Sequence, residues 1–104
     1  MITTKQRAAL RSLANREEAL YQIGKNGITE NLLQTLSDAL EARELIKITV
    51  QEYAPLTPKE AMGELTDRLG CEPVQVIGRR LVVYRESRTN KRIEHAHRLL
   101  RRHV

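Results

Sequence analysis

The sequence is poor in the residues that most enzymes use for catalysis. It holds a single cysteine, and its three histidines all lie beyond residue 94. A Ser/His/Asp or Cys/His arrangement therefore has no base within the first 94 residues. No phosphate-binding P-loop or dinucleotide fingerprint is present, and the spacing of His95 and His97 would point their rings to different sides of a helix, which disfavours zinc. We expect no catalysis, no metal, no cofactor and no small-molecule substrate.

Membrane spans, disulfides and broad aromatic surfaces are lacking as well. No apolar run approaches the roughly 18 residues of a spanning helix, and the polar start gives no core for a signal peptide. The lone Cys71 excludes an internal disulfide and fits a reducing compartment, as a small buried hydrophobe. We therefore expect a cytoplasmic protein without a membrane partner. With three tyrosines and no Phe or Trp, wide stacking platforms are excluded, and Tyr84, set in an apolar strand, is expected in the core.

Positive charge is concentrated at one end of the chain. Residues 1–78 carry 9 basic and 11 acidic side chains, whereas residues 79–104 carry 9 basic and 2 acidic ones. A basic block of this kind favours a polyanion, which in the cytosol is usually nucleic acid. The alternative is a solvated tail that aids solubility.

Periodicity and capping residues predict three helices and four strands. The helices are expected at residues 3 to about 17, 29 to about 43, and 57 to 70, and the strands at 19–23, 45–50, 73–77 and 81–85. Helices that alternate with strands favour parallel crossover pairs, and the last two strands form a hairpin around Gly78. We predict one compact α/β sandwich of order α-β-α-β-α-β-β, with three helices on a four-stranded mixed sheet. The domain covers residues 1–86, and the basic tail 87–104 can form a short helix from about 90 to 102.

The stretch Gly24-Lys25-Asn26-Gly27 joins a predicted strand to a predicted helix. Asn-Gly is a common turn dipeptide, so the spacing alone is weak evidence. The context adds weight, because the N–H groups and partial positive charge at the start of the next helix face the loop. Two residues without side chains would let a phosphate approach, while Lys25 adds charge and Asn26 adds hydrogen bonds. The GXXG loop of KH-type RNA-binding modules clamps a nucleic-acid backbone in this way.

Several stretches together resemble the CRM domain, the chloroplast RNA splicing and ribosome maturation module, and above all its single-domain bacterial form, the YhbY family. The matching stretches, in order, are Lys5-Gln6-Arg7 with Leu10, Ile23 to Thr29, Glu44 to Lys47, Val74 to Gly78, and Leu81 to Arg85. The sequence departs from this pattern at residues 15–21, which are more acidic than expected, and beyond Glu86. The resemblance implies an α/β sandwich related to KH-like GXXG modules and to the C-terminal domain of a bacterial translation initiation factor.

The resemblance also implies a function. Members of this family bind RNA, and the bacterial ones are associated with precursors of the large ribosomal subunit. The expected partners are thus ribosomal RNA and the pre-ribosomal particle. The candidate RNA-binding residues are Gly24, Lys25, Asn26, Gly27, Lys5, Arg7, Arg11, Arg79 and Arg80. Two alternatives stay open: an adaptor that docks its basic tail on an acidic protein, and a splicing-type cofactor.

Overall fold

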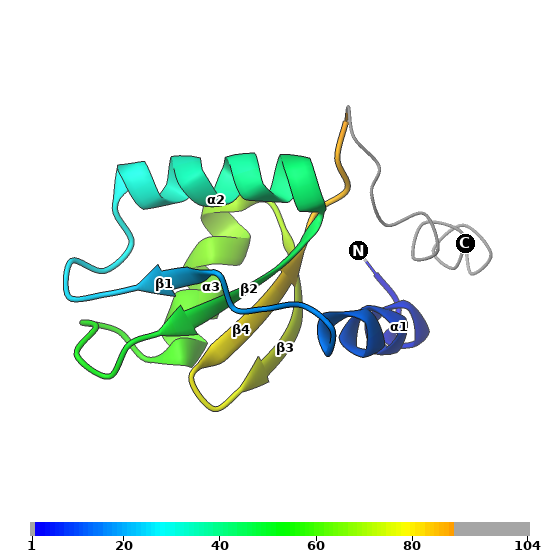
Figure 1. Ribbon diagram of the computed structural model, residues 1–104, viewed down its shortest axis with the longest axis horizontal. Coiled ribbons are helices and arrows are strands. Elements are labelled where there is room, and N and C mark those ends of the chain that lie inside the picture. Colours follow the sequence, from blue (N-terminus) through cyan, green and yellow to red (C-terminus); the bar gives the residue numbers. More distant parts are fainter. Residues whose placement is uncertain (1, 89–104) are drawn as a thin grey trace.

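The structure is a computed structural model that describes residues 2–88 (Figure 1). Within this range the order of elements is the predicted α-β-α-β-α-β-β. The helices are α1 (Thr4–Ala14), α2 (Glu30–Arg43) and α3 (Pro58–Leu69), and the strands are β1 (Tyr21–Ile23), β2 (Leu45–Val50), β3 (Glu72–Ile77) and β4 (Arg80–Tyr84). None of these helices is long and apolar enough to cross a bilayer.

The four strands form one mixed sheet in the order β1-β2-β4-β3. Strands β1 and β2 are parallel and are connected by α2, while β4 runs antiparallel to both of its neighbours. The chain passes from β2 through α3 to β3 at the far edge, and then returns as β4 into the gap. The predicted fold class, three helices on a four-stranded mixed sheet, is confirmed.

A threonine cap directly precedes each of the three helices, at the positions 3, 29 and 57 where the sequence predicted the helices to start. Thr3 and Gln6 form a reciprocal capping box on α1, and Thr57 and Glu60 form another on α3. On α2 the hydroxyl of Thr29 accepts from the N–H of Leu32 at 3.1 Å. Each cap satisfies a backbone donor that the helix itself leaves unpaired.

Other boundaries differ from the prediction by a few residues. Helix α1 ends at Ala14 rather than near residue 17, since the chain there closes a tight turn in which the N–H of Glu17 donates to the Ala14 carbonyl at 3.0 Å. Strand β1 begins two residues late, at Tyr21, because the N–H of Leu20 bonds locally to Glu18 at 3.0 Å instead of to a strand. Strands β3 and β4 each start one residue early.

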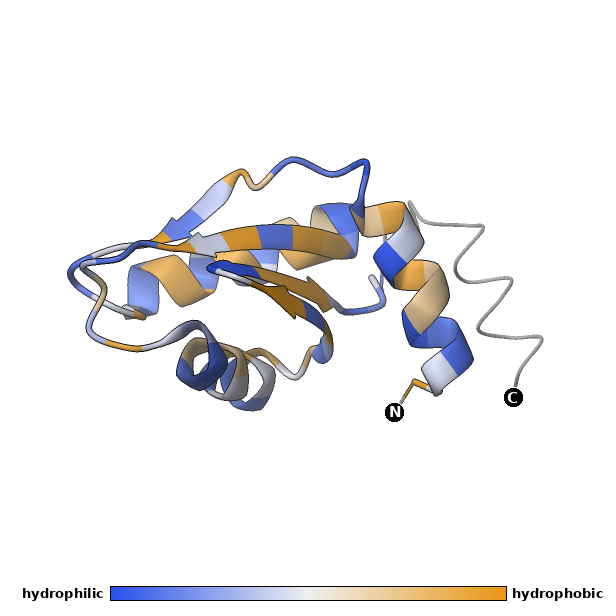
Figure 2. Ribbon diagram, turned by 90° about the horizontal axis from the view of Figure 1, so that it is seen from below, coloured by the Kyte–Doolittle hydropathy of each residue, from blue (hydrophilic) through white to orange (hydrophobic). Residues whose placement is uncertain are grey.

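The sheet buries a different hydrophobic cluster on each face. Helices α2 and α3 share one face, and α1 lies across one end of the strands, which are predominantly hydrophobic in Figure 2. The α2/α3 cluster includes Ile23, Leu36, Leu40, Ile46, Ile48, Val50, Ala61, Leu65, Cys71, Leu81 and Val83. The α1 cluster consists of Leu10, Ala14, Leu45, Val74, Val82 and Tyr84. Cys71 and Tyr84 are thus buried, as the sequence predicted.

After β4 the chain is held by carboxylates at the end of α2. Glu44 is fully buried, and its carboxylate accepts the N–H of Ser87 at 2.7 Å. The carboxylate of Glu41 accepts the N–H of Arg88 at 2.9 Å. The body's contacts therefore continue to Arg88, while the helix predicted from about 90 to 102 lies outside the described residues.

Candidate functional site

The segment Gly24–Gly27 forms a tight turn between β1 and α2. The N–H of Gly27 donates to the carbonyl of Gly24 at 2.9 Å, which closes the turn. Lys25 and Asn26 occupy its two central positions and are exposed. The ammonium of Lys25 and the amide of Asn26 are therefore presented together to solvent, at the end of the sheet where β1 stops.

The two glycines of the turn have different surroundings. Gly27 is buried with a φ of 68°, and a Cβ there would meet Cγ of Pro55 at 3.1 Å. Gly24 is half-buried, and a Cβ there would make an ordinary contact with the Tyr53 ring at 3.8 Å. Glycine is therefore favoured at position 27 for the conformation of the turn and for its contact with Pro55. Of the two, Gly24 is the one whose missing side chain leaves room for a ligand at the surface.

The turn forms one wall of a hollow of about 520 Å³. Its lining residues are Gln22, Gly24, Lys25, Asn26, Gly27, Thr29, Leu32 and Tyr53. The Tyr53 side chain is 66% exposed. A hollow that combines an ammonium, two side-chain amides and an aromatic ring suits a ligand that has both an anionic and a planar part.

Four lining residues, Gln22, Thr29, Leu32 and Tyr53, were not among the candidates predicted from the sequence, and Tyr53 is the aromatic one. It lies three residues beyond the end of β2, far from the turn along the chain. Because β1 and β2 are parallel, their C-terminal ends meet at the same edge, and the segments that follow them lie side by side. The predicted parallel pairing was the signal that could have placed Tyr53 beside Gly24.

The first turn of α2 adds a partial positive charge, but it also carries an acid. The carboxylate of Glu30 lies there and pairs with the guanidinium of Arg68 on α3 at 2.6 Å. Both side chains are substantially exposed, so the pair is screened by solvent. Arg68 offsets the negative charge that Glu30 would otherwise present beside the turn.

Arg79 and Arg80 lie at the turn between β3 and β4 and differ in their contacts. The guanidinium of Arg79 donates to the carbonyls of Val50 and Gln51, at 2.7 and 2.6 Å, and so braces the chain that leaves β2. Arg80 is exposed and is the first residue of β4. Arg80 is thus the one of the two whose side chain faces solvent.

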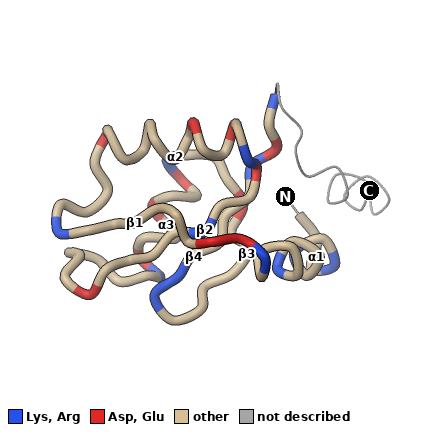
Figure 3. The backbone as a smooth tube through the Cα atoms, viewed as in Figure 1, with Lys and Arg blue, Asp and Glu red and all other residues tan. Residues whose placement is uncertain are grey.

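The basic residues of α1 are not brought together with the turn. Lys5 is exposed, and the Nε–H of Arg7 donates to the carbonyl of Pro73 in β3 at 2.9 Å. Arg11 is half-buried in the last turn of the helix. Figure 3 shows α1 and the β1–α2 turn at opposite ends of the molecule. The Gly24–Gly27 turn and the basic residues of α1 are therefore two separate groups at opposite ends of the sheet, while Arg79 and Arg80 lie at the β3–β4 turn.

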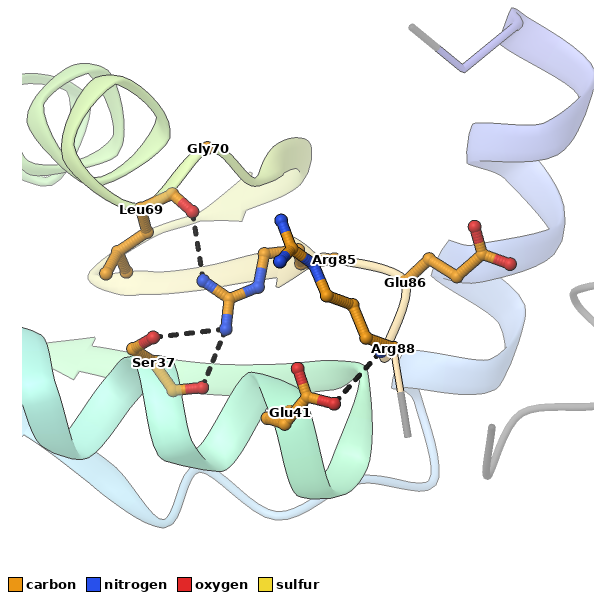
Figure 4. A pocket seen from close by; sticks show the side chains of 7 residues that line it. All are labelled: Ser37, Glu41, Leu69, Gly70, Arg85, Glu86 and Arg88. Atoms are coloured by element: carbon orange, nitrogen blue, oxygen red, sulfur yellow. Dashed lines mark hydrogen bonds between the residues drawn. The ribbon is translucent and has the colours of Figure 1, made fainter. Parts of the chain in front are cut away.

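A second hollow, of about 540 Å³, lies between the ends of α2 and α3 (Figure 4). The guanidinium of Arg85 crosses it and donates to the carbonyls of Leu69 and Ser37, at 3.0 and 2.8 Å. Glu41 and Glu86 line the same hollow. Arg88 adds a second guanidinium to the lining. Because Arg85 already donates to helix carbonyls and two carboxylates line the same hollow, it is less suited to an anion than the hollow beside the Gly24–Gly27 turn.

Nothing in residues 2–88 gathers three or more His, Cys, Asp or Glu side chains as a metal site would. Cys71 is buried, and burial raises the pKa of its thiol from 9.0 to about 11. The thiol therefore stays protonated near neutral pH and is not poised as a nucleophile.

Comparisons with known proteins agree with this architecture. The family model of the CRS1 / YhbY (CRM) domain matches residues 2–85. A Bacillus subtilis protein named "Probable RNA-binding protein YqeI" is 38% identical over 94 residues, which covers 90% of this chain and 98% of that protein. A Haemophilus influenzae protein named "RNA-binding protein" is 33% identical over 90 residues, covering 86% of this chain and 91% of that protein.

A solved structure extends the likeness to three dimensions. The solution structure of a hypothetical protein from Staphylococcus aureus matches with a TM-score of 0.66 and 44% identity. The match covers 88% of this chain and 95% of the other.

Proposed function

Because the chain belongs to the CRS1 / YhbY (CRM) domain family, we propose that it is an RNA-binding protein whose primary contact is the Gly24–Gly27 turn. In this proposal it is a cytoplasmic assembly factor that docks on ribosomal RNA in precursors of the large ribosomal subunit, without a catalytic step. The names of the two bacterial relatives support the RNA-binding part. The ribosomal part comes from the family resemblance.

The observation that carries the proposal is the hollow in which exposed Lys25 and Asn26 lie beside the exposed ring of Tyr53. An RNA strand offers a phosphate and a planar base within one nucleotide. Lys25 would neutralise the phosphate, and Asn26 would donate hydrogen bonds to its oxygens. Gly24 leaves space for the backbone to approach, and the Tyr53 ring would stack on a base or ribose.

Replacing Lys25 tests this site directly. We expect Lys25→Glu to weaken binding of a labelled RNA hairpin at least tenfold at fixed salt, since a charge-assisted contact becomes a repulsion. Lys59→Glu is the matched control, because it makes the same charge change on an exposed residue of α3 that does not line the hollow. The glutamate introduced at position 59 lies in the first turn of α3, where a negative charge stabilises the helix. Equal affinity of the two variants would contradict the site.

The ribosomal role is tested in cells. Crosslinking of the protein to RNA, followed by sequencing of the bound RNA, should enrich precursors of the large-subunit ribosomal RNA. The Lys25→Glu variant should lose that enrichment at equal protein levels. Enrichment of messenger or intron RNA without ribosomal precursor would overturn the assembly role and favour the splicing-type alternative.

A further inference from the structure

Part of the sheet face opposite α2 and α3 is left open by α1. On this face β2 presents Leu45, Lys47 and Thr49 in alternation with the buried residues of the other face. Helix α1 covers the end that holds Leu45 and its partner Tyr84, together with Val82. Toward the other end, none of the three helices in residues 2–88 covers the cross-strand row of Gln22, Thr49 and Arg80. These three residues and Lys47 are called the open strip.

The register shows that the strip is continuous across three strands. Gln22 of β1 is opposite Thr49 of β2, and Thr49 is opposite Arg80 of β4. Gln22 and Arg80 are exposed, and Lys47 and Thr49 are half-buried. Neighbouring strands are about 4.8 Å apart, so the row spans about 10 Å of surface from β1 to β4.

The four residues of the strip carry two positive charges, on Lys47 and Arg80, and no negative charge. Strands β1, β2 and β4 contain no aspartate or glutamate. In β3, Glu72 accepts the N–H of Ile2 beneath α1, away from the strip. The chain's own segment 89–104 carries five basic residues and one acidic residue, so it has the same sign as the strip and does not complement it.

The strip also connects the two separated groups of candidate residues. Gln22 lines the hollow beside the Gly24–Gly27 turn, and the amide of Gln51 donates to it at 2.7 Å. At the other end of β2, Lys47 is opposite Val82, which packs under α1. A ligand that leaves the turn along this face therefore meets Thr49, Arg80 and Lys47 before it reaches the basic residues of α1.

We propose that the open strip is a second contact for the same RNA strand, with Lys47 and Arg80 on successive phosphates and Thr49 and Gln22 hydrogen-bonded to the sugar–phosphate backbone between them. The acidic pair Glu17 and Glu18, in the segment before β1, repels phosphates and directs the strand over β2 and β4. This inference rests on the proposed RNA-binding function and extends it from one turn to a path along the sheet.

A single substitution tests the strip without weakening the sheet. In Thr49→Glu the new carboxylate lies opposite Arg80, where a cross-strand pair of opposite charges favours the fold. It also repels phosphates at the centre of the strip. We expect binding of a labelled RNA hairpin with a single-stranded extension to weaken roughly tenfold at fixed salt, with an unchanged or raised melting temperature.

A charge-removing pair gives a second readout. Lys47→Gln combined with Arg80→Gln should lower the slope of log affinity against log salt by roughly 0.7 for each single-strand phosphate that the variant no longer neutralises. The matched control is Arg43→Gln combined with Arg88→Gln. Arg43 is the last residue of α2, and the N–H of Arg88 donates to Glu41 in the last turn of the same helix. That end of α2 is about 20 Å from the Gly24–Gly27 turn. The control pair should change the slope less than the strip pair.

The outcomes separate this inference from the function on which it rests. If the full chain binds the hairpin and Lys25→Glu weakens binding at least tenfold, but both strip variants bind normally, the strip is overturned and the proposed function stands. If the full chain binds no RNA, both fail. If Thr49→Glu instead converts a dimer to a monomer in analytical ultracentrifugation, with RNA affinity unchanged, the strip is an interface between copies and the inference is overturned.

Discussion

At the scale of single residues, the two glycines of the Gly24–Gly27 turn differ in how much a side chain at each position should cost in stability. We expect Gly27→Ala to destabilise the protein by about 1 to 2 kcal/mol, because φ at this position is 68° and Cγ of Pro55 lies 3.1 Å from the new Cβ. Gly24→Ala should unfold at nearly the wild-type denaturant concentration, since neither restriction applies there. Equal losses of stability in urea titrations would contradict the assigned difference.

Tyr53 is the second residue whose role can be isolated. Because its ring is 66% exposed, Tyr53→Ala should change stability little. It should weaken RNA binding by about 1 to 3 kcal/mol, the usual range for base stacking on an aromatic side chain. Tyr53→Phe keeps the ring and serves as the control. If the alanine variant binds RNA as tightly as the phenylalanine variant, stacking is absent.

At the scale of elements, the first turn of α2 combines an attraction and a repulsion for phosphate. We expect Glu30→Gln to raise RNA affinity a few-fold at low salt, because it removes a carboxylate beside the turn. Loss of the exposed pair with Arg68 should cost less than about 1 kcal/mol of stability. Glu64→Gln is the control, since Glu64 lies 4.0 Å from the same guanidinium but on α3. An equal gain in affinity from both variants would point to net charge alone.

The elements also show what the sequence could predict. Helix starts were placed correctly because Thr3, Thr29 and Thr57 act through neighbours three residues away, which a local pattern reveals. The start of β1 was predicted two residues too early, because it depends on whether the N–H of Leu20 bonds to a distant strand or to Glu18 nearby. Local signals identify elements reliably, whereas the length of an edge strand depends on tertiary pairing.

At the scale of the whole molecule, the basic tail can be separated from the body. Truncation after Arg88 keeps the hydrogen bonds that Ser87 and Arg88 make to α2, so the body should keep its stability. We expect the truncated chain to retain substantial affinity for RNA with a smaller salt dependence, since four net positive charges are removed. Complete loss of RNA binding, together with loss of a protein partner in pull-downs, would favour the adaptor alternative.

The candidate site was predictable from the sequence in part. The turn at Gly24–Gly27 is contiguous in the sequence, so its glycines, its positive charge and its side-chain amide can be recognised without a structure. Tyr53 and the open strip are assembled from β1, β2 and β4, and their proximity follows only from the strand order and register. The same order shows why basic residues predicted as one set, such as Arg7 and Lys25, lie at opposite ends of the molecule.

The position of β4 has a consequence for how the protein is made. The last strand of the sheet fills the gap between β2 and β3, and it makes the ladders on both sides of that gap. During synthesis the sheet therefore stays divided until Tyr84 has left the ribosome, with one edge of β2 and one edge of β3 unpaired until then. Nascent chains that stop before residue 80 therefore expose the edges of β2 and β3 that β4 pairs in the complete sheet.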